Sequence, residues 1–118
     1  MRITTILCLA LIGAIAHADA TEISDPDTVT YLRAVHNALG TASQAISACA
    51  SDGGDRQECL CKYEDLVSSF HATVTKLLRE HPEVAEYATV NFRDESGGTI
   101  AQNIPAMIRQ VENPPVCS

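Results

Sequence analysis

Tryptophan is absent from this 118-residue chain, which has only five aromatic residues. Proteins that bind bases commonly stack them on aromatic rings, so we expect no stacking platform for bases or sugars. The sequence also lacks a cluster of Lys and Arg, and its formal net charge is −7. Such a chain repels phosphate backbones and anionic lipid headgroups, which argues against binding to nucleic acid or to a membrane surface.

Motifs for phosphate, dinucleotide and hydrolase chemistry are missing as well. No P-loop, GxGxxG or GxSxG pattern occurs. Ser68 and Ser69 lie near His71, but a serine nucleophile also needs an acid that orients the histidine and donors for the oxyanion. Carboxylates are plentiful, yet adjacent acids on a helix point apart and do not face each other across a cleft. We therefore expect no enzyme and no cofactor.

The first 20 residues have the three parts of a secretory signal peptide. Arg2 supplies the positive start, Ile3–Ala16 is apolar or small apart from two threonines, and small-x-small sites end at Ala18 and Ala20. The apolar run is shorter than the roughly 20 residues that cross a bilayer. We expect cleavage after Ala20, with Ala18 as the alternative, and a secreted or periplasmic protein.

Residues 21–118 are expected to form a single small helical domain, because so short a chain has no room for a second core. Loss of residues 1–20 removes one arginine and one aspartate, so the net charge stays at −7. Negative charge attracts positive partners. If the mature chain binds another exported protein, that protein is expected to be basic, and no membrane association is expected after signal cleavage.

Four cysteines remain after the signal peptide: Cys49, Cys59, Cys61 and Cys117. An even number in a short exported chain predicts a disulfide framework. Of the three possible pairings, the one that joins Cys59 to Cys61 closes a ring too small for relaxed disulfide geometry. Two pairings are left, and the positions of the cysteines on the predicted helices distinguish between them.

Apolar spacing predicts two long helices. The first, about residues 26–51, begins with Asp25 as cap and Pro26 in the first turn, and a small residue at Gly40 would allow another helix to approach closely. Its apolar positions are Val29, Leu32, Val35, Leu39, Ala42, Ile46 and Cys49. The second, about residues 55–80, has its apolar stripe at Cys59, Tyr63, Val67, Phe70, Val74 and Leu77.

The short link at Gly53-Gly54 indicates that these helices form an antiparallel hairpin. Reflected through this turn, Cys49 falls opposite Cys59 on the apolar stripes. Cys61 lies two residues further on, about 200° around the helix, and points elsewhere. We therefore expect disulfides between Cys49 and Cys59 and between Cys61 and Cys117.

The C-terminal segment is harder to assign. A short helix is expected over 83–88 and a last helical stripe from Ile104 to Val111. Between them, 89–93 and 99–103 have the composition of strands around a turn at 94–98, so a small β-hairpin is the alternative to loop. The fold class is thus all-α or mostly α, a disulfide-pinned hairpin with a C-terminal segment of short helices.

The cysteines and histidines after residue 20 are the candidate metal ligands. Cys59 and Cys61 could bind soft metals such as Cu(I) as thiolates, but export favours disulfides. His36, His71 and His81 include no i,i+4 pair of the kind common in zinc sites. We expect no metal site.

Surface recognition remains, and the segment Asn91, Phe92, Arg93, Asp94 and Glu95 is the candidate partner loop. The alternative is that Phe92 and Val90 face the core while the rest is a solvated turn. The first functional hypothesis is an exported non-enzymatic protein that binds another protein, as an inhibitor or immunity-like factor does. The alternatives are a small metal-binding or catalytic protein that uses His and Cys, and a carrier of an apolar small ligand between helices.

Overall fold

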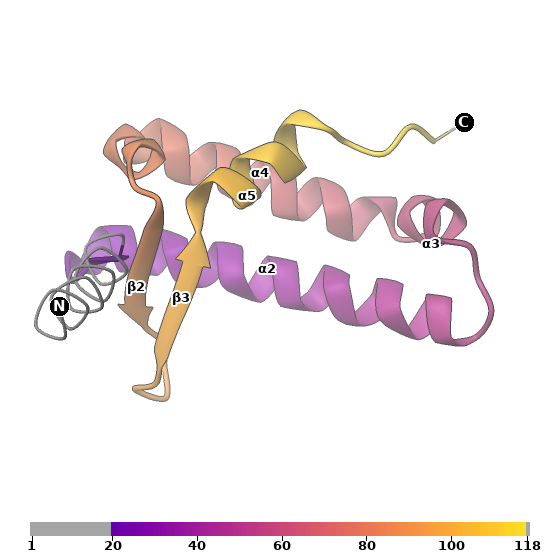
Figure 1. Cartoon of the computed structure of the whole chain (residues 1–118), viewed down its shortest axis with the longest axis horizontal. Coiled ribbons are helices and arrows are strands. Elements are labelled where there is room, and N and C mark those ends of the chain that lie inside the picture. Colours follow the sequence, from indigo (N-terminus) through magenta and orange to yellow (C-terminus); the bar gives the residue numbers. More distant parts are fainter. Residues whose placement is uncertain (1–19, 118) are drawn as a thin grey trace, which may run out of the picture.

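Two long helices, α2 (Pro26–Ser51) and α4 (Glu64–Glu80), lie side by side and form the body of the protein (Figure 1). The computed structural model describes residues 20–117. This part of the chain is mostly helical, with a small sheet and two disulfides, and the predicted fold class is confirmed at that level. No helix in it is long and apolar enough to cross a membrane.

The start of α2 is the one that the sequence predicts. Asp25 has extended backbone geometry, and its Oδ2 accepts hydrogen bonds from the Thr28 amide at 3.0 Å and the Thr28 hydroxyl at 2.8 Å. Pro26 follows at the first helical position, where its missing N–H costs nothing. The helix then runs to Ser51 without interruption, although Gly40 stands in its middle.

The second predicted helix, about 55–80, is in fact two helices, so its prediction as one continuous element was wrong. The structure contains α3 (Arg56–Lys62) and α4, separated at Tyr63, whose φ of −109° and ψ of 33° are not helical. In Figure 1, α3 is seen nearly end-on, whereas α4 lies across the picture. The break follows a helix that is cross-linked twice: Cys59 is joined to α2 and Cys61 to the C-terminal tail.

The C-terminal segment contains the β-hairpin that the sequence offered as an alternative. After the 3₁₀ helix η1 (Pro82–Glu86), β2 (Thr89–Arg93) pairs antiparallel with β3 (Thr99–Asn103), and α5 (Ile104–Glu112) follows directly. Asn103 caps α5, since its Oδ1 accepts from the Ala106 amide at 2.9 Å.

A third strand, β1 (Ala20–Glu22), was not predicted. It pairs in parallel with β2, which becomes the central strand, and the Ile23 amide donates to the Asn91 carbonyl at 2.9 Å. The predicted signal peptide lies, apart from Ala20, outside the described residues. The strand therefore ties the segment that precedes α2 to the hairpin.

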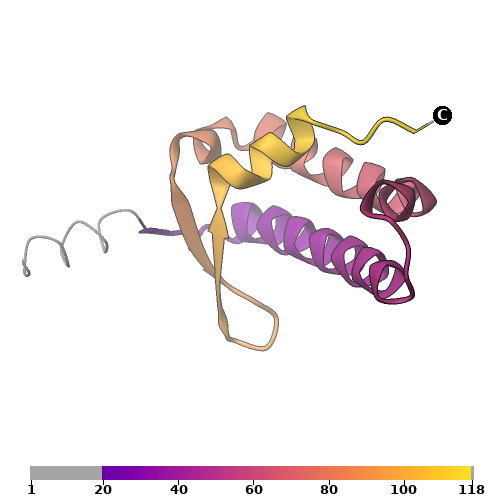
Figure 2. The same ribbon diagram turned by 45° about the vertical axis from the view of Figure 1, so that its right-hand side comes forward.

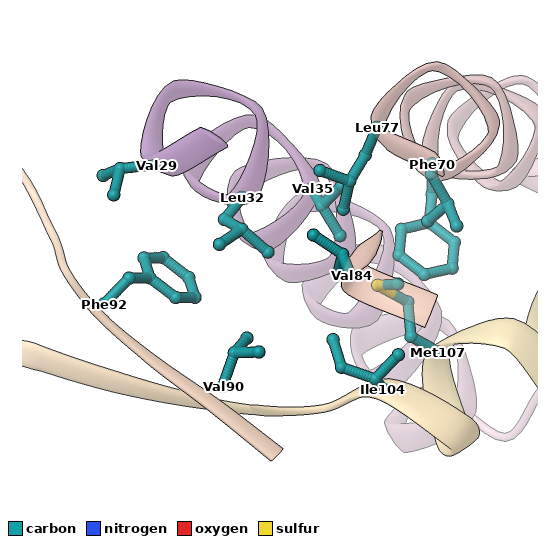
Figure 3. Close-up of a cluster of buried hydrophobic side chains, with 11 residues drawn as sticks. Val29, Leu32, Val35, Phe70, Leu77, Val84, Val90, Phe92, Ile104 and Met107 are labelled. Atoms are coloured by element: carbon teal, nitrogen blue, oxygen red, sulfur yellow. The ribbon is translucent and has the colours of Figure 1, made fainter. Parts of the chain in front are cut away.

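The hydrophobic core lies where the β-hairpin and α5 pack on one end of the helix pair, while α3 lies at the other end (Figure 2). Figure 3 shows side chains from both long helices meeting residues of the C-terminal segment. The core residues are Val29, Leu32, Val35, Phe70, Val74, Leu77, Val84, Val90, Phe92, Ile104 and Met107. This core fixes the hairpin relative to α2, and it does not extend along the whole apolar stripe of α2.

Candidate functional site

All four cysteines of residues 20–117 are cross-linked, in the pairing that the sequence predicts. Cys49 is joined to Cys59 with a Cα–Cα distance of 5.7 Å, and Cys61 to Cys117 at 5.5 Å. A cysteine in a disulfide offers no thiolate, and the thiolate is the form that binds metals and attacks substrates. The Cys59-x-Cys61 motif thus acts in this structure as a double anchor for α3.

The three histidines of the described residues lie at separate places in the fold. His36 is exposed on α2, His71 is half-buried on α4 beside Phe70, and His81 is the C-cap of α4. Within residues 20–117, no three His, Cys, Asp or Glu side chains gather in a way that could hold a metal ion.

His81 is at the centre of a polar network that joins three elements. Its Nε2 lies 2.6 Å from Asp27 Oδ2 on α2, and its Nδ1 lies 3.3 Å from Glu83 Oε1 on η1 and 3.2 Å from Thr28 Oγ1. The hydrogen bond with Asp27, reinforced by Glu83, raises the pKa of His81 above its ordinary value. The protonated ring can then donate to both carboxylates.

The order Thr28–His81–Asp27 resembles a nucleophile, base and acid, but its geometry does not serve catalysis. The Thr28 hydroxyl donates its proton to Asp25, not to the histidine, and Thr28 is only 5% exposed. A nucleophile must be within reach of both its base and a substrate. The network therefore acts as a clamp between the start of α2 and the end of α4.

Sequence reasoning did not find this clamp, although its signal is present. An antiparallel pairing of two helices brings the start of the first beside the end of the second. Asp25 and Asp27 stand at that start, and His81 stands at that end. A histidine opposite two carboxylates across a predicted hairpin could have been identified from these positions.

The candidate partner segment is divided between the core and the surface. The Phe92 ring is 1% exposed and packs in the core, so it is not accessible to a partner. Asn91 and Phe92 belong to β2, as does Arg93, whose side chain is exposed. Asp94 and Glu95 begin the turn, and Glu95 is exposed.

Hydrogen bonds to one carboxylate oxygen hold the turn between β2 and β3. Asp94 Oδ1 accepts from the Ser96 hydroxyl at 2.7 Å, the Gly98 amide at 2.8 Å and the Ser96 amide at 3.0 Å. These bonds, led by that of the Ser96 hydroxyl, lower the pKa of Asp94 below its ordinary value. Gly97 has a φ of +92°, which favours glycine, and its carbonyl accepts from Arg93 at 3.0 Å.

Arg33 links this turn to α2. Its Nε donates to the Arg93 carbonyl at 2.7 Å, and one terminal nitrogen donates to the Asp94 carbonyl at 3.3 Å. A hollow of about 270 Å³ lies between helix and turn, lined by Arg33, His36, Asn37, Asp94, Glu95, Ser96 and Ile100. We name the six polar residues of this set (Arg33, His36, Asn37 and 94–96) the loop–helix surface.

Known proteins add no identification. Comparison with protein-family models, curated proteins and solved structures gives no match for this chain. Functional inference therefore rests on the site itself.

Sequence reasoning found the turn residues of the loop–helix surface but not its helical half. Arg33, His36 and Asn37 lie on the polar side of α2, where nothing in the helical spacing separates them from other exposed residues. They become part of a site only because the hairpin crosses α2 at this point, which depends on tertiary packing.

Proposed function

We propose that this chain is an exported, non-enzymatic protein that binds another protein through the loop–helix surface, as an inhibitor or immunity-like factor does. The observation that carries the proposal is the turn held by Asp94 and Arg33, which leaves the Glu95 and Ser96 side chains exposed. A loop that is already ordered loses less conformational entropy on binding, so more of its contact energy becomes affinity.

The hollow beside the turn supports the same function. Binding energy at protein interfaces concentrates in a few side chains that fill pockets on the partner. A hollow of about 270 Å³ between α2 and the turn can receive one such side chain. The turn and the helix then contact it from two sides.

The charge of the surface favours a basic partner. The lowered pKa of Asp94 keeps its carboxylate ionised, and Oδ1 is occupied by the turn. Its Oδ2 makes no hydrogen bond with the described part of the chain, so it can accept from a partner's Lys or Arg. Glu95 adds a second exposed carboxylate, and the net charge of −7 steers a basic protein toward the molecule.

Export is part of the proposal. Residues 1–20 have the pattern of a signal peptide, and two intramolecular disulfides suit an oxidising compartment. In a chain of this size, such cross-links add to the stability that a small core provides.

Site-specific photocross-linking in the exporting cell tests the proposal. A photoreactive phenylalanine analogue replaces Glu95 in one variant and Ala72, which is exposed on α4, in the control. We expect one defined protein adduct from position 95 and none from position 72. Adducts from position 72 alone would exclude the loop–helix surface, and no adduct from either would contradict protein binding.

Charge reversal then measures the contribution of the carboxylate. Glu95→Lys is expected to weaken binding of the cross-linked partner at least tenfold. The matched Glu86→Lys, at an exposed position on η1, is expected to weaken it less than twofold. Equal losses in both variants would indicate general steering by net charge.

A further inference from the structure

A second hollow lies along α2, beside the core and beyond it toward α3. The apolar stripe of α2 continues past Val35 to Leu39, Ala42 and Ile46, and both Leu39 and Ile46 are half-buried. These residues line a groove of about 610 Å³. The groove therefore continues the apolar face of α2 beyond the residues that form the core cluster.

Apolar residues line the opposite side of the groove as well. Val67 and Phe70 of α4, at most 8% exposed, lie across from the stripe of α2, and the half-buried Leu60 of α3 closes the end. The helix pair thus supplies two apolar walls. A volume of about 610 Å³ is within the range of small-molecule sites, roughly 300–1,000 Å³.

The C-terminal tail forms a further wall, and it is tied in place. The Cys61–Cys117 disulfide holds its end, and Gln57 Nε2 donates to the Val116 carbonyl at 2.7 Å. Pro114 and Pro115, which have no N–H to satisfy, line the groove between α5 and this anchor. Among the residues described, Val116 is the one large apolar side chain that is exposed, at 87%.

One positive charge stands at the groove. Arg56, at the start of α3, lines it and is exposed. Its guanidinium makes no hydrogen bond or ion pair with any residue between 20 and 117. In a chain with a net charge of −7, an arginine beside an apolar groove favours an occupant with a single negative charge.

From these features we infer that the groove binds a small amphipathic molecule, an aliphatic chain ended by one carboxylate. The chain would lie between α2 and α4, would cover Val116, and would present its carboxylate to Arg56 at the rim. This site is separate from the loop–helix surface and needs no protein partner.

The size of the groove favours a small molecule over a helix from another protein. An α-helix with its side chains is about 10 Å across, so 610 Å³ corresponds to about 8 Å of helix, or about five residues. A helix that short makes few contacts. A flexible aliphatic chain needs no such width and can lie between the two helices.

Calorimetric titration with submicellar dodecanoate tests the inference, with dodecyldimethylamine N-oxide as the soluble ligand of equal chain length and no net charge. Ser43 is exposed and lines the groove, so Ser43→Trp fills it, whereas the control Ser69→Trp adds the same ring at an exposed α4 position outside the groove. We expect dodecanoate to bind the natural chain and Ser69→Trp equally, and Ser43→Trp at least tenfold more weakly. Equal binding to both variants, or no binding up to about 1 mM, would overturn the inference.

Arg56→Gln tests the carboxylate separately. We expect about tenfold weaker dodecanoate binding and unchanged binding of the amine oxide. If the amine oxide binds the natural chain as well as dodecanoate and Arg56→Gln changes neither, the assignment of an anionic ligand is wrong. A dimer in native mass spectrometry that Ser43→Trp abolishes would instead identify a second copy of the chain as the occupant.

Discussion

Gly40 has open space where a side chain would begin, whereas Gly54 is tightly enclosed. Substitution of each glycine by alanine therefore tests the packing at that position. The expected close approach of another helix at Gly40 does not occur, because a Cβ built there meets nothing within 4 Å. A Cβ at Gly54 would lie 2.7 Å from Cys59 Sγ and 2.9 Å from Cys49 Sγ. The glycine at position 54 is required by the disulfide beside it, whereas the glycine at position 40 is not required by packing.

We therefore expect Gly40→Ala to raise the free energy of unfolding by about 0.5–1 kcal/mol, since alanine has the higher helix propensity. Gly54→Ala is expected to lower it by about 1–3 kcal/mol through overpacking. Urea unfolding of both variants measures the difference. A destabilised Gly40→Ala would mean that a neighbour contacts this face of α2.

Asp94 is expected to order the turn. Asp94→Ala removes the acceptor of three hydrogen bonds, so the Ser96 and Gly98 amides should exchange with deuterium at least tenfold faster. Asp94→Asn retains an Oδ1 acceptor and should protect these amides far better. Equal exchange in the two variants would show that Arg33 and the strands suffice to hold the turn.

Between elements, the His81 clamp makes stability depend on pH. Asp27, Glu83 and Thr28 contact the His81 ring, Asp25 contributes a nearby negative charge, and the Tyr31 ring packs at 5.5 Å. Because the pKa of His81 is raised in the folded state, its contribution is complete below the ordinary value of 6.5 and is lost as the pH rises through the raised pKa.

Urea unfolding at several pH values above 5 measures this contribution. We expect the natural chain to lose stability as the pH rises above about 6.5 and through the raised pKa of His81, and His81→Gln to lose much less over the same rise in pH. The exposed His36→Gln is the matched control and should keep the pH dependence of the natural chain. If His36→Gln flattens the profile instead, the clamp does not carry the effect.

The two disulfides stabilise loops of different length. On the chain-entropy model, closure across 10 residues contributes about 3 kcal/mol and closure across 56 residues about 4 kcal/mol. The double variant Cys61→Ser/Cys117→Ser should therefore lose more stability in urea than Cys49→Ser/Cys59→Ser. The reverse order would indicate that the link between α2 and α3 matters more than the tail anchor.

Local pattern predicted some elements well and others not at all. The Asp25 cap and the disulfide pairing follow from capping and helical periodicity. The strands at 89–93 and 99–103 form the β-hairpin that their composition offered only as the alternative to loop. The break at Tyr63 could not be predicted, since no glycine or proline marks it in the sequence. It lies next to α3, which both disulfides cross-link. The strand β1 is only three residues long, and it exists because β2 offers a free edge.

At the scale of the whole molecule, the extent to which the C-terminal segment covers α2 determines where both proposed sites lie, the loop–helix surface and the groove. Where the hairpin crosses α2, it forms the loop–helix surface. Past α5, the apolar stripe of α2 remains open as the groove. Periodicity identifies the stripe, but where its cover ends depends on the placement of β2, β3 and α5. The turn residues could thus be predicted from the sequence, and the helical half of the surface and the groove could not.

The central claim is that the chain is exported and matures with its sulfurs joined as cross-links. Mass spectrometry of unreduced protein from the exported fraction tests it most directly. The protein is digested with pepsin, because cleavage beside Leu60 separates Cys59 from Cys61. We expect an intact mass for residues 21–118 less four hydrogens, with peptides that link Cys49 to Cys59 and Cys61 to Cys117. A retained N-terminal segment, or four thiols that alkylate without reduction, would contradict the claim.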